Sequence, residues 1–185
     1  MNKALSIPAF IGLLMIIAFY IVSLTIQTVA IFIPGVIITY IFYVRTAFKN
    51  PPVPEKIVPL YLIALAIQFI HFAEEYVMDF HIAVPELLGT PGFSLDYWVI
   101  FNMVAYAFFV LGTIAFYKQI KIFMIIPLFF IVVGVMLNGI GHILISVYTG
   151  GYFPGLYTAP VYLIIGPIIL RTIIEESKFS KPILH

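Results

Sequence analysis

The sequence predicts an all-α, polytopic membrane protein, a bundle of six transmembrane helices in a single domain over residues 1–185. The chain has 185 residues, of which 63% are hydrophobic and only 9% are charged, whereas soluble domains are about 45–50% apolar. A soluble fold of this length could not bury so much apolar surface. The absence of cysteine excludes disulfides, thiolate ligands and cysteine catalysis. A net charge of +1 gives no reason to expect nucleic-acid binding.

The first apolar stretch, residues 7–47, is long enough for two crossings, because about 20 residues suffice for one. A polar cluster marks the expected turn of this extra N-terminal helical hairpin. One long tilted helix is the alternative, and the chain would then have five spans. The cluster consists of Ser23, Thr25, Gln27 and Thr28.

The rest of the chain divides at its polar segments. A proline-rich loop, residues 45–56, precedes a third predicted span over residues 57–79. The less hydrophobic segment 80–94 is expected to lie at the membrane interface or to fold back as a lid. The remaining spans are predicted over residues 95–117, 121–148 and 156–174.

The basic residues predict the orientation, because cytoplasmic loops concentrate Lys and Arg. With six spans and both termini inside, all nine basic residues fall on the cytoplasmic side, whereas five spans would separate Lys3 from the others. We therefore expect a multi-pass protein of the cell membrane with both termini cytoplasmic. The nine are Lys3, Arg45, Lys49, Lys56, Lys118, Lys121, Arg171, Lys178 and Lys181.

The third predicted span contains the motif His71-Phe-Ala-Glu74-Glu75 in otherwise apolar surroundings. Ionisable side chains inside a membrane are costly and therefore indicate functional sites. At about 100° per residue, Gln68, His71 and Glu75 share one face of a helix, and Glu74 points to the edge of that face. No Lys or Arg is expected at this depth, so the carboxylates must be protonated, hydrated, paired with histidinium or bound to a metal.

Two other predicted spans place polar residues at the same depth. The fifth span carries Asn138 and His142, which lie four residues apart on one helix face. The fourth span carries Asn102 about two turns from its outer end. All these residues fall in the outer half of the membrane, so we expect them to line one polar cavity that opens toward the outer leaflet.

The residue types at this site allow two kinds of catalysis. A Glu–His pair suits acid–base chemistry, and two His with one Glu form a common ligand set for zinc or iron. We expect an enzyme that acts on a membrane lipid or another apolar small molecule, as a hydrolase using a divalent metal or as a proton-transfer isomerase. The expected catalytic residues and metal ligands are Glu75, His71, Glu74 and His142, and the expected substrate contacts are Asn102, Asn138, Gln68 and Tyr152.

Two other classes of function stay open. One is a protein that binds or transports a metal ion or protons, although the inner half of the predicted bundle offers few polar groups for a path across the membrane. The other is a non-catalytic scaffold in which the polar cluster only fixes helix packing.

The motifs resemble those of a family of membrane proteins of unknown function that is named for its HXXEE motif. The family pattern combines HXXEE, a second histidine and a YXPG motif. The likeness covers a core of about residues 57–172 and leaves out the N-terminal hairpin. It implies a membrane protein with a site at these motifs, and it brings no established activity. Here the motifs appear as His71-Phe-Ala-Glu74-Glu75, His142 and Tyr152-Phe153-Pro154-Gly155.

Overall fold

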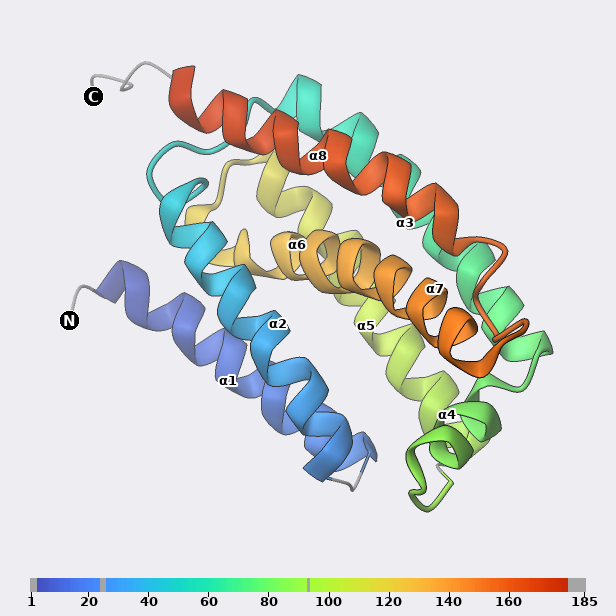
Figure 1. Ribbon diagram of the computed structural model, residues 1–185. Coiled ribbons are helices and arrows are strands. Elements are labelled where there is room, and N and C mark those ends of the chain that lie inside the picture. The colour runs from blue at the N-terminus through green and yellow to red at the C-terminus, as the bar shows by residue number, and fades with distance from the viewer. Residues whose placement is uncertain (1–2, 24–25, 93, 180–185) are drawn as a thin grey trace.

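The computed structural model describes residues 3–23, 26–92 and 94–179, and the described part is helical without strands (Figure 1). The predicted all-α class is confirmed. By length and hydropathy, three helical segments can cross a membrane, namely residues 54–77, 95–117 and 121–149. Three qualifying segments are fewer than the six spans expected.

The N-terminal stretch forms two helices. α1 (Lys3–Ser23) and α2 (Ile26–Arg45) pack against each other and run in opposite directions (Figure 1). The alternative of one long helix over residues 7–47 is therefore wrong. The predicted turn residue Thr25 lies outside the described residues.

α3 (Pro54–Val77) carries the His-Glu motif. A proline in its first turn suits the helix start, because the fixed φ of proline is helical and its missing N–H is not needed there. The helix ends before Asp79, whose φ of 55° is left-handed, a conformation that a short polar side chain tolerates. α4 (Phe80–Leu88) follows and ends at Gly89. The segment expected at the interface or as a lid thus begins with a short helix.

The helix over residues 121–149 is the centre of the fold. It consists of a 3-10 turn η1 (Lys121–Phe123), α6 (Ile125–Phe129), a π-helix η2 (Phe130–Leu137) and α7 (Asn138–Thr149). Helices α2, α3 and α8 contact the π-helix, and α5 (Leu95–Tyr117) contacts α6. Residues 127–133 are buried in succession, as expected of a helix that is apolar on all sides. No residue pattern indicates the π-helix, which ends directly before Asn138.

α8 (Ala159–Phe179) lies beside α3 and α7. It is antiparallel to α3, because Lys56 pairs with Glu176 at one end of the two helices while His71 meets Thr158 at the other. The helix is shifted toward the C-terminus relative to the span predicted over residues 156–174. Its first turn therefore lies next to the His-Glu motif.

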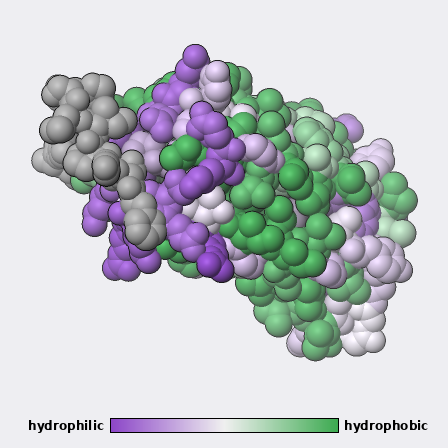
Figure 2. Space-filling view, turned by 90° about the horizontal axis from the view of Figure 1, so that it is seen from above, coloured by the Kyte–Doolittle hydropathy of each residue, from purple (hydrophilic) through white to green (hydrophobic). Residues whose placement is uncertain are grey.

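Basic residues gather at the end of the bundle away from the motif. The Lys121 ammonium donates to the Lys49 carbonyl at 3.2 Å, and Lys56 forms its ion pair with Glu176 at 2.5 Å. Figure 2 shows hydrophilic side chains collected at one end of this face, beside a broad hydrophobic surface. One of the nine basic residues, Lys181, lies outside the described residues.

Candidate functional site

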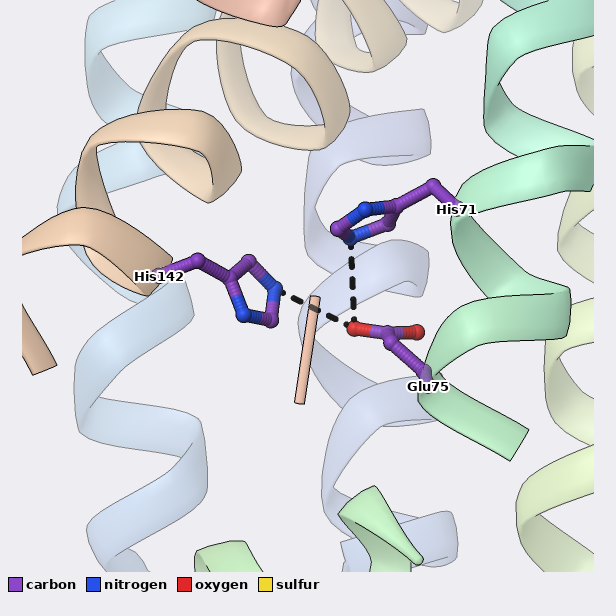
Figure 3. A group of neighbouring side chains, drawn as sticks. All are labelled: His71, Glu75 and His142. Carbon is purple, nitrogen blue, oxygen red and sulfur yellow. Dashed lines mark ion pairs between the residues drawn. The ribbon is translucent and has the colours of Figure 1, made fainter. Parts of the chain in front are cut away.

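Three buried side chains from α3 and α7 meet in the protein interior (Figure 3). One carboxylate oxygen of Glu75, Oε1, lies 3.4 Å from His71 Nε2 and 3.2 Å from His142 Nε2. The two imidazole rings stand edge to face with their centroids 4.7 Å apart. Each residue offers one possible ligand atom, and these three atoms lie within 4.8 Å of one another. We call His71, Glu75 and His142 the His–Glu cluster.

Helical spacing explains how the cluster forms. His71 and Glu75 are four residues apart on the buried face of α3, together with Gln68. His142 is four residues after Asn138 in α7, so both point toward α3. The Asn138 amide donates from Nδ2 to His71 Nε2 over 2.8 Å. Two elements thus contribute side chains to the same few ångströms of the protein interior.

The cluster is closed to the surface. His71 is fully buried, Glu75 is 6% exposed and His142 is 3% exposed. The expected polar cavity that opens to the outer leaflet is therefore not seen at these residues. Aromatic rings cover His142, with the Phe80 and Phe153 centroids at 5.5 and 6.4 Å from its ring centroid.

Glu74 lies outside the cluster and contacts the segment before α8. Its Oε1 accepts hydrogen bonds from the Tyr152 hydroxyl and the Tyr157 N–H, both at 2.9 Å. Its Oε2 accepts from the Thr158 N–H at 3.0 Å and the Thr158 hydroxyl at 2.6 Å. A carboxylate at free N–H groups of a helix start is stabilised by those donors and by the helix dipole. Glu74 therefore fastens the start of α8 to α3.

Tyr152 is held as a donor in this arrangement. Partial burial and, after it, the hydrogen bond to Glu74 raise the pKa of Tyr152 above its usual value. The phenol therefore keeps its proton across the physiological pH range. Tyr152 is one of the four expected substrate contacts, and in the structure its hydroxyl donates a hydrogen bond to Glu74 of the motif.

Gly155, the last residue of the YXPG motif, makes room for His142. Its φ is 94°, and a Cβ atom at this position would stand 2.4 Å from both Cε1 and Nδ1 of the His142 ring. No larger residue fits here without displacing the imidazole. The motif, which the sequence indicates only as a turn, therefore touches both the Glu74 carboxylate and the His–Glu cluster.

The other two expected substrate contacts lie at different distances from the cluster. Gln68 donates to the Tyr106 hydroxyl at 2.9 Å and accepts from the Tyr162 hydroxyl at 2.6 Å, and the Tyr162 ring lies 5.0 Å from the ring of His71. Asn102 instead donates to the Trp98 carbonyl of its own helix at 2.9 Å. Gln68 is thus a neighbour of the cluster, whereas the Asn102 amide is engaged by its own backbone.

One residue that sequence reasoning missed is Thr158. Its hydroxyl oxygen lies 2.6 Å from Glu74 Oε2 and 2.6 Å from His71 Nδ1. A signal existed, because Ser and Thr are favoured directly before a helix and α8 begins at the next residue. The predicted span began earlier, at residue 156, which placed Thr158 inside the helix.

An apolar groove of about 630 Å³ opens between α3 and α5. Asp96 is the one acidic residue among those that line it, and none of the cluster residues does. The Trp98 and Phe80 rings, 6.0 Å apart, lead from the wall of this groove toward His142. The other lining residues are Phe72, Ala73, Tyr76, Val77, Leu95, Val99 and Ile100.

The family described as proteins of unknown function with an HXXEE motif matches residues 62–170, which is more than half of the chain. The matched range contains the His–Glu cluster, Glu74 and the segment Tyr152–Thr158, and it leaves out α1 and α2. No curated protein and no solved structure matches the chain.

Proposed function

The chain belongs to the HXXEE family, and we propose that it is a membrane enzyme whose His–Glu cluster binds a divalent metal ion, zinc or iron, and acts on a lipid or another apolar substrate. The observation that carries this proposal is the meeting of two imidazoles at one buried carboxylate oxygen. Ionised carboxylates are costly to bury without a cationic partner. Among the described residues, the ion-pair partners of Glu75 are these two imidazoles.

The geometry of the cluster fits such an ion. Zinc binds imidazole nitrogen and carboxylate oxygen at about 2.0–2.2 Å, so two ligands at tetrahedral angles stand about 3.4 Å apart. Two of the three separations, those from the imidazole nitrogens to Glu75 Oε1, are 3.4 and 3.2 Å, and all three ligand atoms lie within 4.8 Å of one another. Two histidines and one glutamate leave a coordination position open, which is typical of catalytic zinc sites and of non-haem iron sites.

The residues around the site would have different roles in the reaction. His71, Glu75 and His142 would hold the ion, and the ion would supply Lewis acidity for hydrolysis of a polar bond in the substrate. Phe80 and Phe153 would keep bulk water away from His142, which strengthens electrostatic interactions inside the site. An apolar substrate is favoured because the helices around the cluster have hydrophobic outer surfaces and because an apolar groove lies nearby between α3 and α5.

A second candidate is proton-transfer isomerisation without a metal. The observation that favours it is the Asn138 amide, which lies 2.8 Å from His71 Nε2 and thus occupies a lone pair that a metal would need. Glu75 and His142 would then exchange a proton with the substrate as an acid–base pair. Transport is less well supported, because α3 offers few polar groups between Gln68 and the end of the bundle that carries the basic residues. The buried residues of this part of α3 are apolar, apart from the Tyr61 hydroxyl, which donates to the Phe109 carbonyl.

Metal analysis of the purified protein tests the proposal. We expect close to one equivalent of zinc or iron in the wild type, and an affinity lowered by at least about 100-fold in His71→Ala, Glu75→Gln and His142→Ala, because each removes a ligand. His81→Ala is the matched control, since His81 lies at the same end of the protein and outside the cluster. Elemental analysis and chelator competition give the two quantities.

The same proteins are then incubated with a lipid extract of the expression host's membranes, and the lipids are compared by mass spectrometry. A lipid changed by the wild type and His81→Ala but not by Glu75→Gln supports the enzyme. Equal metal content in all variants would contradict the assigned ligands. If the wild type changes a lipid but contains no metal, the acid–base candidate is supported. If the wild type contains metal but changes no lipid, metal binding or transport is supported. If the wild type neither binds metal nor changes a lipid, and the cluster variants are less thermally stable than the wild type, the non-catalytic scaffold is supported.

We also propose that the chain is a single domain that crosses the membrane six times, with both termini cytoplasmic. α1, α2 and α8 have 21, 20 and 21 residues, which suffices for a crossing. The hairpin of α1 and α2 contacts α6 and η1 of the central helix, which favours one domain. The basic residues at one end indicate the cytoplasmic side, and the His–Glu cluster would then lie in the outer half of the membrane.

Cysteine labelling tests this topology, because the natural chain contains no cysteine. Gly151→Cys and Lys49→Cys place single thiols at exposed positions near opposite ends of the bundle. In intact cells, a membrane-impermeant maleimide should label the cysteine at position 151 and leave that at position 49 unlabelled until the membrane is permeabilised. The reverse pattern would overturn the orientation, and labelling of both positions in intact cells would overturn the odd number of crossings, three, between them.

A further inference from the structure

We infer that Thr158 is a positioning residue, which links the Glu74 carboxylate to His71 and sets the tautomer of the His71 imidazole so that the lone pair of Nε2 faces the His–Glu cluster. This inference rests on the proposed metal site for its functional meaning. The hydrogen-bond chain itself stands on the described contacts alone.

The chain of contacts is short and buried on one side. Thr158 Oγ1 lies 2.6 Å from Glu74 Oε2 and 2.6 Å from His71 Nδ1. The opposite ring nitrogen of His71, Nε2, lies 3.4 Å from Glu75 Oε1. The imidazole therefore has the Thr158 hydroxyl at one nitrogen and the cluster at the other.

Counting donors fixes the direction of each hydrogen bond. An ionised carboxylate only accepts, whereas a threonine hydroxyl has one proton to donate. Glu74 already accepts two backbone N–H groups, from Tyr157 and Thr158, which favours its ionised form. The Thr158 proton then points to Glu74, and Thr158 Oγ1 must accept from His71 Nδ1–H.

The other side of the ring agrees with this assignment. If Nδ1 carries the proton of a neutral imidazole, Nε2 has the lone pair. The neighbour of Nε2 at 2.8 Å is the Asn138 amide nitrogen, which only donates. Both ring nitrogens are thus satisfied by one tautomer, in which Nε2 carries the lone pair that a metal would need once the Asn138 amide gives it up.

Metal-binding histidines typically donate their second N–H to an oxygen acceptor, which orients the ring and makes it a better ligand. Thr158 is that acceptor for His71, and Glu74 polarises it from behind. His142 lacks such a partner within the described residues, because its Nδ1 is buried without a hydrogen bond. Glu74 and Thr158 therefore orient the ring of His71 and not that of His142.

Thr158→Val and Thr158→Ser test the inference, since valine has the shape of threonine without the hydroxyl and serine keeps the hydroxyl. In metal-free protein with ¹⁵N-labelled histidine, the ¹⁵N shifts of His71 should indicate the Nδ1–H tautomer in the wild type and in Thr158→Ser. They should indicate a mixture or the opposite tautomer in Thr158→Val. Affinity for zinc should fall about 10–100-fold in Thr158→Val and stay within a few-fold of the wild type in Thr158→Ser.

Thr149→Val is the control for loss of a threonine hydroxyl, because among the described residues the Thr149 hydroxyl donates to carbonyls of its own helix. It should leave the His71 shifts unchanged. If Thr158→Val does not fold, Thr158→Ala removes the hydroxyl with less bulk. An unchanged His71 tautomer in the variant without the hydroxyl overturns the inference, whether or not zinc binds. A changed tautomer in a protein that binds no zinc keeps the hydrogen-bond chain and overturns the metal proposal instead.

Discussion

Glu74 and Glu75 are neighbours in one helix, yet the fold gives them opposite surroundings. Glu74 is half-buried and accepts four hydrogen bonds from the segment before α8, two of them from backbone N–H groups. Glu75 is buried and meets two imidazoles. One carboxylate is satisfied by donors that cannot change their protonation, whereas the other faces groups that can gain a proton, lose one or bind a metal.

The difference shows what an adjacent pair of acids does in this fold. Successive residues of a helix point about 100° apart, so two neighbouring carboxylates cannot share one ion or one proton easily. Glu74 uses its charge to hold α8 against α3, and Glu75 uses its charge inside the His–Glu cluster. The motif therefore combines a structural acid and a chemical acid, and a pair of matched substitutions can separate them.

Glu75→Gln should lower metal affinity more than Glu74→Gln does, whereas Glu74→Gln should cost more stability. Glu75→Gln should lower the metal affinity by about 100-fold or more. It should change the free energy of unfolding by less than about 1 kcal/mol, because a neutral amide costs less to bury than a carboxylate. Glu74→Gln should lower metal affinity less, by about 10-fold, and destabilise the protein by about 1–2 kcal/mol through lost charge-assisted hydrogen bonds.

Chelator competition measures the affinity, and thermal unfolding of the metal-free proteins in detergent measures the stability. Metal-free protein is needed because a bound ion would itself stabilise the wild type. If Glu75→Gln unfolds the metal-free protein while Glu74→Gln does not, the roles assigned to the two carboxylates are reversed.

Residue patterns predicted the parts of this fold that depend on one helix at a time. α5 has the predicted bounds, residues 95–117, because polar residues flank its long apolar run on both sides and mark where the helix begins and ends. The shared buried face of Gln68, His71 and Glu75 follows from helical spacing and is found in α3. Asn138 also reaches His71, as expected of two spans with polar residues at one depth.

Contacts between distant segments could not be predicted in this way. Thr158 is 84 residues from Glu74, and nothing in its local sequence shows which helix the start of α8 will meet. Asn102 was expected at the site from its depth, yet its amide has an acceptor within its own helix at the Trp98 carbonyl. Depth along a helix is readable from sequence, whereas the direction of a side chain and the docking of a loop depend on the tertiary packing.

Gly155 connects the two halves of the comparison, because it belongs to the segment that Glu74 holds and it touches the histidine that Glu75 contacts. Gly155→Ala places a methyl group at 2.4 Å from the His142 ring, so the ring or the segment must move, and metal affinity should fall about 10-fold. The positive φ adds about 1–2 kcal/mol of strain for any L-residue. Gly150→Ala carries the same strain at a φ of 73° with no atom within 4 Å, so it should lose stability but keep its metal affinity. If the two variants lose affinity equally, Gly155 is a turn residue only, and the contact with His142 does not shape the site.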